Sequence, residues 1–404
     1  MWRLYSIEEV IKDTVKHLEK KFDEEEINVL DALNRFSARE YYSLIDLPPY
    51  PKSTMDGYAV LSSDCSGASE NSPIFLEVLT EVIRSGEKPT IKISQGKCVK
   101  IETGGFLPKG ADAVIPIEDV ILSKEHIEVT KPLSKYENVS LPGEELSRDD
   151  KIIEEGELIR PWHISTLYAS RYRKIFVKKI NAGIIYTGDE FKNGENIPYT
   201  NYLVKGWLEE NGFKVTDIIY SNDDPFSIRS SVQRLLSKNT FIVILGGTSK
   251  GDCDYVYNGL EKLASNIYRG VRMKPGKTTT IYVIDGKPVF SISGLPAAAF
   301  SSLELIIKKI LFLWLHLRYL SPPKIKAKLN RRVTSKLGFI SFTRVRVFER
   351  GGELFAEPLV SGGSGSLRSL VLGNGYIVVP EHVEGFDKGD LVEVVLYGSI
   401  KKNI

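Results

Sequence analysis

An alternation of apolar runs and helical stretches begins near Lys178, and it constrains the fold more than any other feature of this sequence. Three apolar runs end in polar or glycine-rich segments, and a helical pattern follows each: AGIIYT before GDE, KVTDIIY before SNDD, and FIVIL before GGTSKGD. Strands and helices that alternate at this spacing predict a doubly wound α/β domain with a largely parallel sheet.

The flanking segments have other patterns. Residues 1–45 are expected to be helical as far as the prolines of DLPPYPKS (46–53), each of which removes a backbone donor. From 54 to about 139, short apolar runs separated by turn residues predict an all-β segment. We also expect a long amphipathic helix over 298–317. After SPP (321–323), a β-type remainder dense in Gly and Val predicts a small barrel or sandwich.

Length and composition exclude several classes of protein. A chain of 404 residues with a net charge of +2 predicts two to four domains, and it rules out a basic nucleic-acid coat or an acidic tail. Three scattered cysteines without a CxxC pair and five histidines without HExxH argue against disulfide frameworks and zinc sites. The run from Ile310 to Leu317 is too short to span a bilayer. We therefore expect a soluble, cytoplasmic protein.

The polar segments that follow the three strands are the first candidate site, because ligands of open α/β sheets bind beyond the carboxyl ends of the strands. These segments are Thr187-Gly188-Asp189-Glu190, Asn222-Asp223-Asp224 and Gly246 to Asp254. Their glycines would let backbone N–H groups approach a phosphate, and their carboxylates suit Mg²⁺. The alternative is that Asp223, Asp224 and Asp252 are helix N-caps, which aspartate forms well.

The segment MKPGKTTT (273–280) contains a GKT that resembles the end of a P-loop. The first glycine of that motif is displaced by one residue, and a β-rich run follows where a P-loop has a helix, so we reject nucleotide hydrolysis. Lys274 and Lys277 could still hold a phosphate as point charges. The alternative for both lysines is a solvated turn.

Acidic residues are absent between Leu305 and Phe348, where eleven Lys or Arg residues occur. A stretch of this kind is either a solvated surface or a basic face that attracts an anionic ligand or an acidic partner.

Six segments together resemble one known family. In order along the chain they are LPPYPKSTMDGYAV (47–60), IETGGFLPKGADAVIPIEDV (101–120), IIYTGDEF (184–191), LGGTSKGDCDYV (245–256), VRMKPGKTT (271–279) and SISGLP (291–296). They are similar in order and spacing to the molybdopterin molybdenumtransferases, the MoeA family, which includes the C-terminal domain of gephyrin. The similarity continues through GSGSLRSLVLGNGYIVVP (363–380) and so covers essentially the whole chain.

The resemblance implies four domains. They are a discontinuous α-rich domain I (1–45 and 140–172), a β insertion domain II (46–139), a molybdopterin-binding α/β domain III (173–321) and a C-terminal β-barrel domain IV (322–404). It also implies an elongated homodimer whose active cleft uses both subunits. The family inserts molybdate, or tungstate, into adenylylated molybdopterin and releases AMP in the presence of Mg²⁺. The molybdopterin adenylyltransferase is the partner that this reaction suggests.

The resemblance also assigns roles to individual residues. Asp56 and Thr103 would face the molybdate and the pterin, and Glu145 would complete the catalytic set. Glu190, Asp224 and Asp254 would serve the Mg²⁺ and the adenylate. The expected substrate-binding residues are Gly247, Ser249, Lys274, Lys277, Ser364 and Ser366.

Three departures from the family pattern leave a second function open. Glu145 stands where the family has Asp, Tyr199-Thr200-Asn201 where it often has Asp-Thr-Asn, and Pro296-Ala297-Ala298-Ala299 where it has Pro-Gly-Asn-Pro. The alternative to an insertase is therefore a catalytically impaired paralogue that carries or scaffolds molybdopterin. A third hypothesis is an adenylyltransferase that uses the α/β domain alone.

Overall fold

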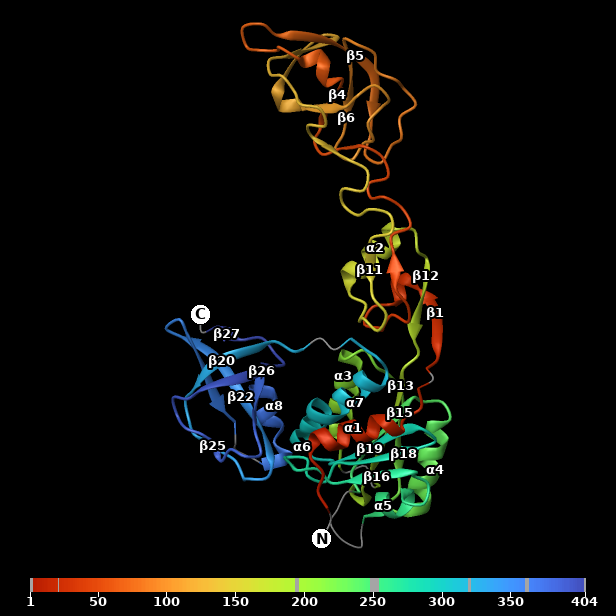
Figure 1. Cartoon of the computed structure of the whole chain (residues 1–404), viewed down its shortest axis with the longest axis vertical. Coiled ribbons are helices and arrows are strands. Elements are labelled where there is room, and N and C mark those ends of the chain that lie inside the picture. Colours follow the sequence, from red (N-terminus) through yellow and green to blue (C-terminus); the bar gives the residue numbers. More distant parts are fainter. Residues whose placement is uncertain are drawn as a thin grey trace.

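We describe the protein from a computed structural model, which places residues 3–20, 22–192, 196–247, 254–318, 321–359 and 363–402. The molecule is elongated (Figure 1). A β module stands at one end, a small mixed module lies in the middle, and the α/β domain and a C-terminal barrel lie side by side at the other end.

The α/β domain is built on a six-stranded sheet in the order β14-β13-β15-β19-β18-β16. The first four strands are parallel and the last two antiparallel, which confirms the predicted doubly wound, largely parallel sheet. Their bounds are β13 Asn181–Thr187, β14 Lys214–Ser221, β15 Phe241–Leu245, β16 Asn266–Arg269, β18 Thr280–Ile284 and β19 Lys287–Ile292.

Helices cover both faces of this sheet because its central strands are apolar on both sides. On β13, Ile184 packs into one core cluster and its neighbour Ile185 into another. The first cluster contains residues of α1 (Ile7–His17), α3 (Tyr199–Glu210) and α6 (Pro296–Ser302). The second contains residues of α4 (Pro225–Leu236) and α5 (Tyr255–Leu260).

The helix expected over 298–317 is confirmed, with an irregularity near its centre. It begins at Pro296, continues through the π-helical turn η5 (Leu303–Ile307) and ends as α7 (Lys308–Trp314). Proline suits this first position because its missing N–H would have no intrahelical partner there.

The prediction that residues 1–45 are helical is wrong beyond His17. Helix α1 has the expected cap, a reciprocal pair between Ser6 and Glu9. After it, β1 (Glu24–Asn28) pairs with β12 (Lys174–Lys178), and β2 (Tyr41–Tyr42) pairs with β11 (Lys151–Ile153). These short strands depend on partners more than a hundred residues away, which no local pattern reveals. With α2 (Pro161–Ala169), they form the middle module.

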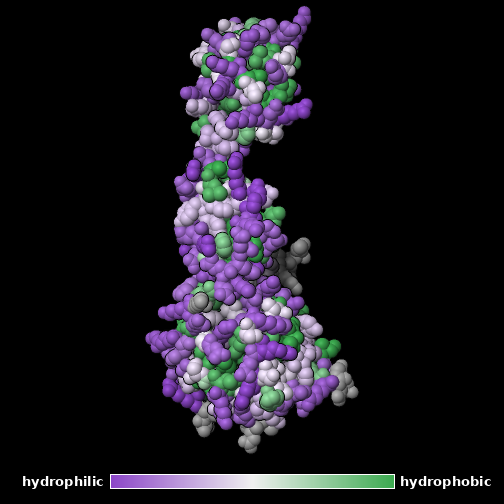
Figure 2. Space-filling model, turned by 90° about the vertical axis from the view of Figure 1, so that its right-hand side faces the viewer, coloured by the Kyte–Doolittle hydropathy of each residue, from purple (hydrophilic) through white to green (hydrophobic). Residues whose placement is uncertain are grey.

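The all-β prediction for 54–139 is confirmed by a six-stranded sheet in the order β7-β4-β6-β5-β9-β8. Its strands are β4 Gly57–Val60, β5 Ile74–Ile83, β6 Lys97–Ile101, β7 Ala113–Pro116, β8 Val120–Ser123 and β9 His126–Val129. A narrow neck joins this module to the middle one (Figure 2). Strands β3 (Lys52–Ser53) and β10 (Val139–Ser140), which flank the six strands in the sequence, pair with each other.

The C-terminal barrel is closed, because β22, β23, β20, β26 and β24 pair in that order and β24 pairs back to β22. Strand β17 (Met273–Lys274) of the preceding domain adds to β22. The bounds are β20 Lys324–Leu329, β21 Val333–Thr334, β22 Ile340–Arg350, β23 Glu353–Pro358, α8 Leu367–Leu372, β24 Gly375–Val379, β25 Gly385–Phe386, β26 Leu391–Leu396 and β27 Lys401–Lys402. Of the two folds that the sequence predicts for this region, a small barrel or a sandwich, the structure has the barrel.

Among the helices that the structure describes, none has the length and apolar character needed to cross a membrane.

Two glycines give a matched test of the fold. A Cβ at Gly57 would lie 1.9 Å from the Ile115 carbonyl oxygen on β7, whereas a Cβ at Gly206 in α3 would meet no atom within 4 Å. Gly57→Ala should therefore destabilise the insertion sheet, by about 2 kcal/mol or more. Gly206→Ala should stabilise the protein by about 0.5–1 kcal/mol. Hydrogen exchange of residues 57–60 and 113–116 measures the first effect, and equal protection in both variants would contradict it.

Candidate functional site

The carboxyl ends of β13 and β15 open into a cavity of about 650 Å³. Its lining includes Thr187, Glu190, Tyr199, Gly246 and Gly294. Gly246 has a φ of 95°, and a Cβ there would lie 2.4 Å from the Thr187 carbonyl oxygen. Only glycine fits this close approach of two strand ends. The structure therefore contains the predicted crevice, and backbone atoms that no side chain covers form part of its lining.

Two of the three predicted metal ligands cap helices. Asp224 accepts a hydrogen bond from the Ser227 N–H at 2.8 Å at the start of α4, and bonds from the Ser227 side chain and backbone lower its pKa. Asp254 caps α5 by accepting from the Tyr257 N–H at 3.1 Å, and it also pairs with Arg269 at 2.6 Å. The N-cap alternative left open for Asp224 thus holds, and Asp254 has the same role.

The remaining acids at this edge are Glu190 and Asp223. Asp223 accepts from the Thr187 hydroxyl and, at 3.1 Å, from the Asp189 N–H. Glu190 is exposed on the cavity wall. Over the ranges that the structure describes, no three acidic, His or Cys residues lie together as a metal site. Magnesium therefore stays a prediction.

The loop that contains Lys274 and Lys277 lies between β17 and β18, so a strand follows it and the rejection of a P-loop is confirmed. Gly276, with a φ of 101°, packs its backbone against α6, where the Ser301 hydroxyl donates to the Pro275 carbonyl at 2.9 Å. The helix thus fixes the conformation of the loop. Lys274 is exposed at the mouth of a second cavity, of about 690 Å³.

Arg344 of β22 lines this second cavity with Lys274, and it was not singled out from the sequence. Its side chain is buried, and its guanidinium donates to the Ser369 hydroxyl at 2.9 Å and to the Gly363 carbonyl at 3.4 Å. Burial lowers its pKa. No carboxylate pairs with it among the described residues. A buried cation with neutral partners is costly unless an anion joins it, so this cavity is suited to an anion.

Most of the other cations in the acid-free stretch have an ordinary role. Seven of the eleven form ion pairs with acids outside the stretch, and all of these except Lys308 have exposed side chains, which favours the solvated-surface interpretation for those six. They are Lys308, Arg318, Lys324, Lys328, Arg331, Arg332 and Arg346. Arg344 differs from the six exposed residues by its burial, and from Lys308 because Lys308 faces the Glu304 carboxylate.

The two cavities adjoin each other across the short helix η6 (Gly363–Gly365). Gly363 lines the second cavity, while Leu295 lines the first and would contact a Cβ on Gly365 at 3.5 Å. Ser366 caps α8 by accepting from the Ser369 N–H at 3.2 Å. Ser249 lies outside the described residues, as does the side chain of Ser364. Gly247 follows β15 with a φ of 61°.

Asp56 and Thr103 form a pair in the β insertion sheet. The Thr103 N–H and hydroxyl donate to one Asp56 oxygen at 2.6 and 2.8 Å, and these bonds lower the pKa of Asp56. Asp56 directly precedes β4 and Thr103 follows β6, and Figure 1 places these two strands at the opposite end of the molecule from β13 and β22. Glu145 pairs with Lys52 of β3 at 2.7 Å. One chain alone therefore does not bring these residues to the two cavities.

Comparison with known proteins agrees with this architecture. Models of the MoeA N-terminal region (domain I and II) and the MoeA C-terminal region (domain IV) match residues 5–170 and 326–397. A third model, "Probable molybdopterin binding domain", matches residues 183–312. A protein of Methanocaldococcus jannaschii assigned by name to molybdopterin biosynthesis is 34% identical, over 97% of each chain. The chain belongs to the MoeA family.

Two further relatives support this assignment. A molybdopterin molybdenumtransferase of Staphylococcus aureus is 29% identical over 90% of this chain and 89% of its own. The crystal structure of a molybdopterin biosynthesis MoeA protein from Pyrococcus horikoshii superimposes with a TM-score of 0.80 at 27% identity, covering 98% of this chain and 100% of that one. The resemblance seen in the motifs is thus confirmed along the whole chain.

Of the three departures from the MoeA pattern, Glu145 and Tyr199 are exposed and the alanines at the start of α6 are buried. The Thr200 hydroxyl donates to the Gly294 carbonyl at 2.7 Å, which ties the start of α3 to the segment before α6. Ala297, Ala298 and Ala299 are buried in the first turn of α6. Methyl groups fill this space without an unpaired polar atom, so the local structure tolerates the loss of the glycine and asparagine.

The pKa of Asp56 gives a direct test of its pairing. Thr103→Val removes the hydroxyl donor and keeps the N–H, so the pKa should rise part of the way towards that of a free aspartate. Because the folded pKa is lowered, the stabilisation from this pair is present above the unfolded pKa and is lost as the pH falls through the folded value. A carboxylate NMR titration measures the shift. Thr103→Ser is the control, and an unchanged pKa in Thr103→Val would contradict the pairing.

Proposed function

We propose that this chain is a molybdopterin molybdenumtransferase that inserts molybdate or tungstate into adenylylated molybdopterin and releases AMP. The observation that carries the proposal is Arg344, a buried guanidinium with neutral partners, which faces the same cavity as Lys274. A tetrahedral dianion fits two convergent cations, and Arg supplies several fixed donors for its oxygens.

The first cavity is suited to the organic substrate. Tyr186, Ile197 and Tyr199 give it an apolar and aromatic wall, while Gly246 and Gly294 expose backbone to polar ring atoms. Lys277 lies on the same loop as Lys274, beside the second cavity, and suits the phosphates, while Lys274 serves the oxyanion. Since η6 lines the second cavity and neighbours Leu295 of the first, a pterin in the first cavity would place its sulfur atoms towards an oxyanion in the second.

These residues would act by binding and orientation. When both anionic substrates are bound in one complex, their reaction becomes a step within that complex. The cations offset the repulsion between the two negative charges. We include Mg²⁺ in the proposal because the adenylate pyrophosphate is a strong ligand for it, with Glu190 as its nearest described carboxylate candidate on the cavity wall.

AMP release tests the proposal. Purified protein given adenylylated molybdopterin should release AMP only when molybdate or tungstate is added, and omission of Mg²⁺ should slow the release. If the protein binds the adenylate but releases no AMP with either oxyanion, the chain is a carrier or scaffold instead. Consumption of ATP with free molybdopterin would indicate an adenylyltransferase.

Arg344→Met should raise the oxyanion concentration for half-maximal AMP release about 10- to 100-fold, the loss expected for a hydrogen-bonded charge. Arg346→Met is the matched control, because Arg346 lies on the same strand but is exposed and pairs with Glu357 at 2.5 Å. Equal oxyanion dependence in the two variants would count against the site.

We further propose that the active form is a homodimer with a shared cleft. Asp56 and Thr103 lie at the far end of the chain from Arg344 and Lys274, so only a second copy could bring both pairs together. The middle module has exposed apolar side chains that a partner could cover. They are Leu30, Leu33, Tyr42, Leu44, Trp162 and Tyr168.

Mixed dimers test the shared cleft. At an oxyanion concentration that saturates the wild type but lies well below the raised requirement of Arg344→Met, the Asp56→Asn and Arg344→Met homodimers should each release little AMP. Coexpressed at equal amounts, they should recover about one quarter of wild-type AMP release, because half of the dimers are mixed and each mixed dimer has one intact cleft. AMP release from the purified mixture, with the two chains tagged differently, measures this. No recovery would show that each cleft uses a single chain.

A further inference from the structure

We propose that Glu304 is a positioning residue for the oxyanion site, acting through Tyr376 to hold Arg344 opposite Lys274. This inference rests on the proposed function, because it concerns the cavity to which that function assigns the oxyanion. Neither residue contacts the proposed substrates directly.

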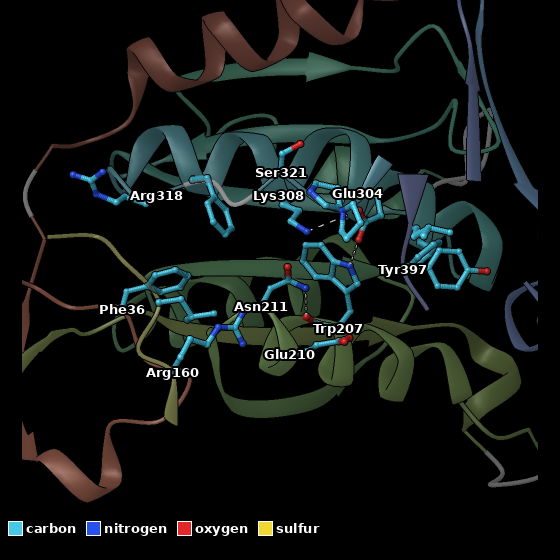
Figure 3. A pocket seen from close by; sticks show the side chains of 16 residues that line it. Phe36, Arg160, Trp207, Glu210, Asn211, Glu304, Lys308, Arg318, Ser321 and Tyr397 are labelled. Carbon is cyan, nitrogen blue, oxygen red and sulfur yellow. Dashed lines mark hydrogen bonds and ion pairs between the residues drawn. The ribbon is translucent and has the colours of Figure 1, made fainter. Parts of the chain in front are cut away.

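Glu304 is a buried carboxylate at the junction of the α/β domain and the barrel. It lies in the π-helical turn η5, and its residue is 8% exposed. Trp207 of α3 donates its indole N–H to one oxygen at 2.6 Å, and Lys308 lies 4.0 Å from the other (Figure 3). The same oxygen accepts the Tyr376 hydroxyl of β24 at 3.3 Å. One carboxylate therefore joins α3, the long helix and the barrel.

Tyr376 connects this carboxylate to Arg344. In the antiparallel ladder between β22 and β24, Tyr376 and Arg344 are directly opposite each other. Opposed residues project from the same face of a sheet, so the position of one limits that of the other. The Tyr376 ring also packs on Phe342, two residues before Arg344, with centroids 4.3 Å apart. Movement of Tyr376 would thus move the part of β22 that carries the guanidinium.

The same helix holds the other cation. The Ser301 hydroxyl donates to the Pro275 carbonyl at 2.9 Å, and the Ser302 hydroxyl lies 2.8 Å from that of Thr279. Pro275 directly follows Lys274. Within four residues, the helix therefore contacts the loop of Lys274 on one side and, through Glu304, the strand opposite Arg344 on the other.

The backbone pairing between the α/β domain and the barrel is short, so side-chain contacts between the two must fix their relative orientation. Strand β17 pairs with β22 over two residues only, Met273 with Ile340 and Lys274 with Ser341. A ladder of that length restrains distance better than rotation. The bond between Tyr376 and Glu304 lies away from this ladder, so it limits rotation of the barrel about it.

A buried carboxylate at this position indicates a specific role, because burying its charge is unfavourable unless its oxygens accept hydrogen bonds. An apolar residue could fill the volume without that cost. The hydrogen bonds from Trp207 and Tyr376 have directional requirements, and directional bonds select one arrangement of two packed domains. Single π-helical turns within α-helices are frequent at functional sites, and the location of Glu304 in such a turn is consistent with this role.

Tyr376→Phe tests the inference because it removes only the hydroxyl. We expect molybdate to bind about three- to tenfold more weakly in calorimetry, the effect of one lost hydrogen bond on the geometry of the site. In AMP release, the KM for molybdate should rise while the KM for the adenylate and kcat stay close to wild type. The matched control is Tyr268→Phe, since Tyr268 is buried to a similar degree and its hydroxyl bonds His17 at 3.1 Å at the far edge of the sheet.

A purely structural role predicts a different result. Tyr376→Phe would then lower the melting temperature as Tyr268→Phe does, with the molybdate affinity unchanged, and that result would overturn the inference. Glu304→Gln is the second variant, because it keeps the shape and one acceptor. Its molybdate affinity should lie between those of wild type and Tyr376→Phe, and a wild-type affinity in both variants would also overturn the inference.

The proposed function and this inference fail in different ways. A wild-type protein that binds molybdate but releases no AMP would refute the insertase and leave the binding comparison intact. A wild-type protein that releases AMP, with molybdate binding unaffected by Tyr376→Phe, would refute the positioning role alone. A wild-type protein that binds neither oxyanion, even with the adenylate present, would refute both.

Discussion

A buried positive charge at the junction of two domains is the constraint on which this account depends. Arg344 is removed from water, and the described groups that it contacts are a hydroxyl and a carbonyl. Neutral dipoles offset only part of the cost of burying a guanidinium, and the rest is recovered when an anion enters. The pairing of β17 with β22 then places Lys274 at the same cavity. The fold thus maintains a site that is most stable with an anion bound.

The α/β sheet and the long helix explain how such a site is kept open. The parallel strands end together at one edge, and glycines there allow a cavity instead of packed side chains. The helix over 296–314 lies against this sheet and also contacts the barrel, with Phe300 packed on Phe342 and Tyr397. Two cavities with different linings therefore adjoin here, one with an aromatic wall and exposed backbone and the other with Arg344 and Lys274. This combination suits a reaction between a bulky organic anion and a small inorganic one.

The sequence predicts the sheet well and the small strands poorly, for a physical reason. Strands such as FIVIL (241–245) are buried on both faces, so their apolar runs are visible locally. Strand β1 (Glu24–Asn28) is held by pairing with β12, and its charged residues give no strand signal of their own. The sequence groups the acidic residues after the three strands as one candidate metal site, because each of them could bind a metal or cap a helix. The structure separates them, since Asp224 and Asp254 serve their own helices.

Arg344 shows the limit of reasoning from charge alone. It is one of eleven cations in an acid-free stretch, and its neighbours Arg331, Arg332 and Arg346 have the same chemistry in sequence. Burial distinguishes it, and its buried side chain is held by Ser369 and Gly363, which lie elsewhere in the chain. The family resemblance, by contrast, was correct along the chain because its motifs combine several short patterns in a fixed order.

The most direct measurement of the central claim is the anomalous diffraction of tungsten in crystals of the protein soaked with tungstate. Tungstate shares the charge and shape of molybdate, and its anomalous signal locates it without assumptions about the surrounding density. The account predicts the strongest peak between the Arg344 guanidinium and the Lys274 ammonium, within hydrogen-bonding reach of both. A strongest peak elsewhere, with this cavity unoccupied at saturating tungstate, would contradict it.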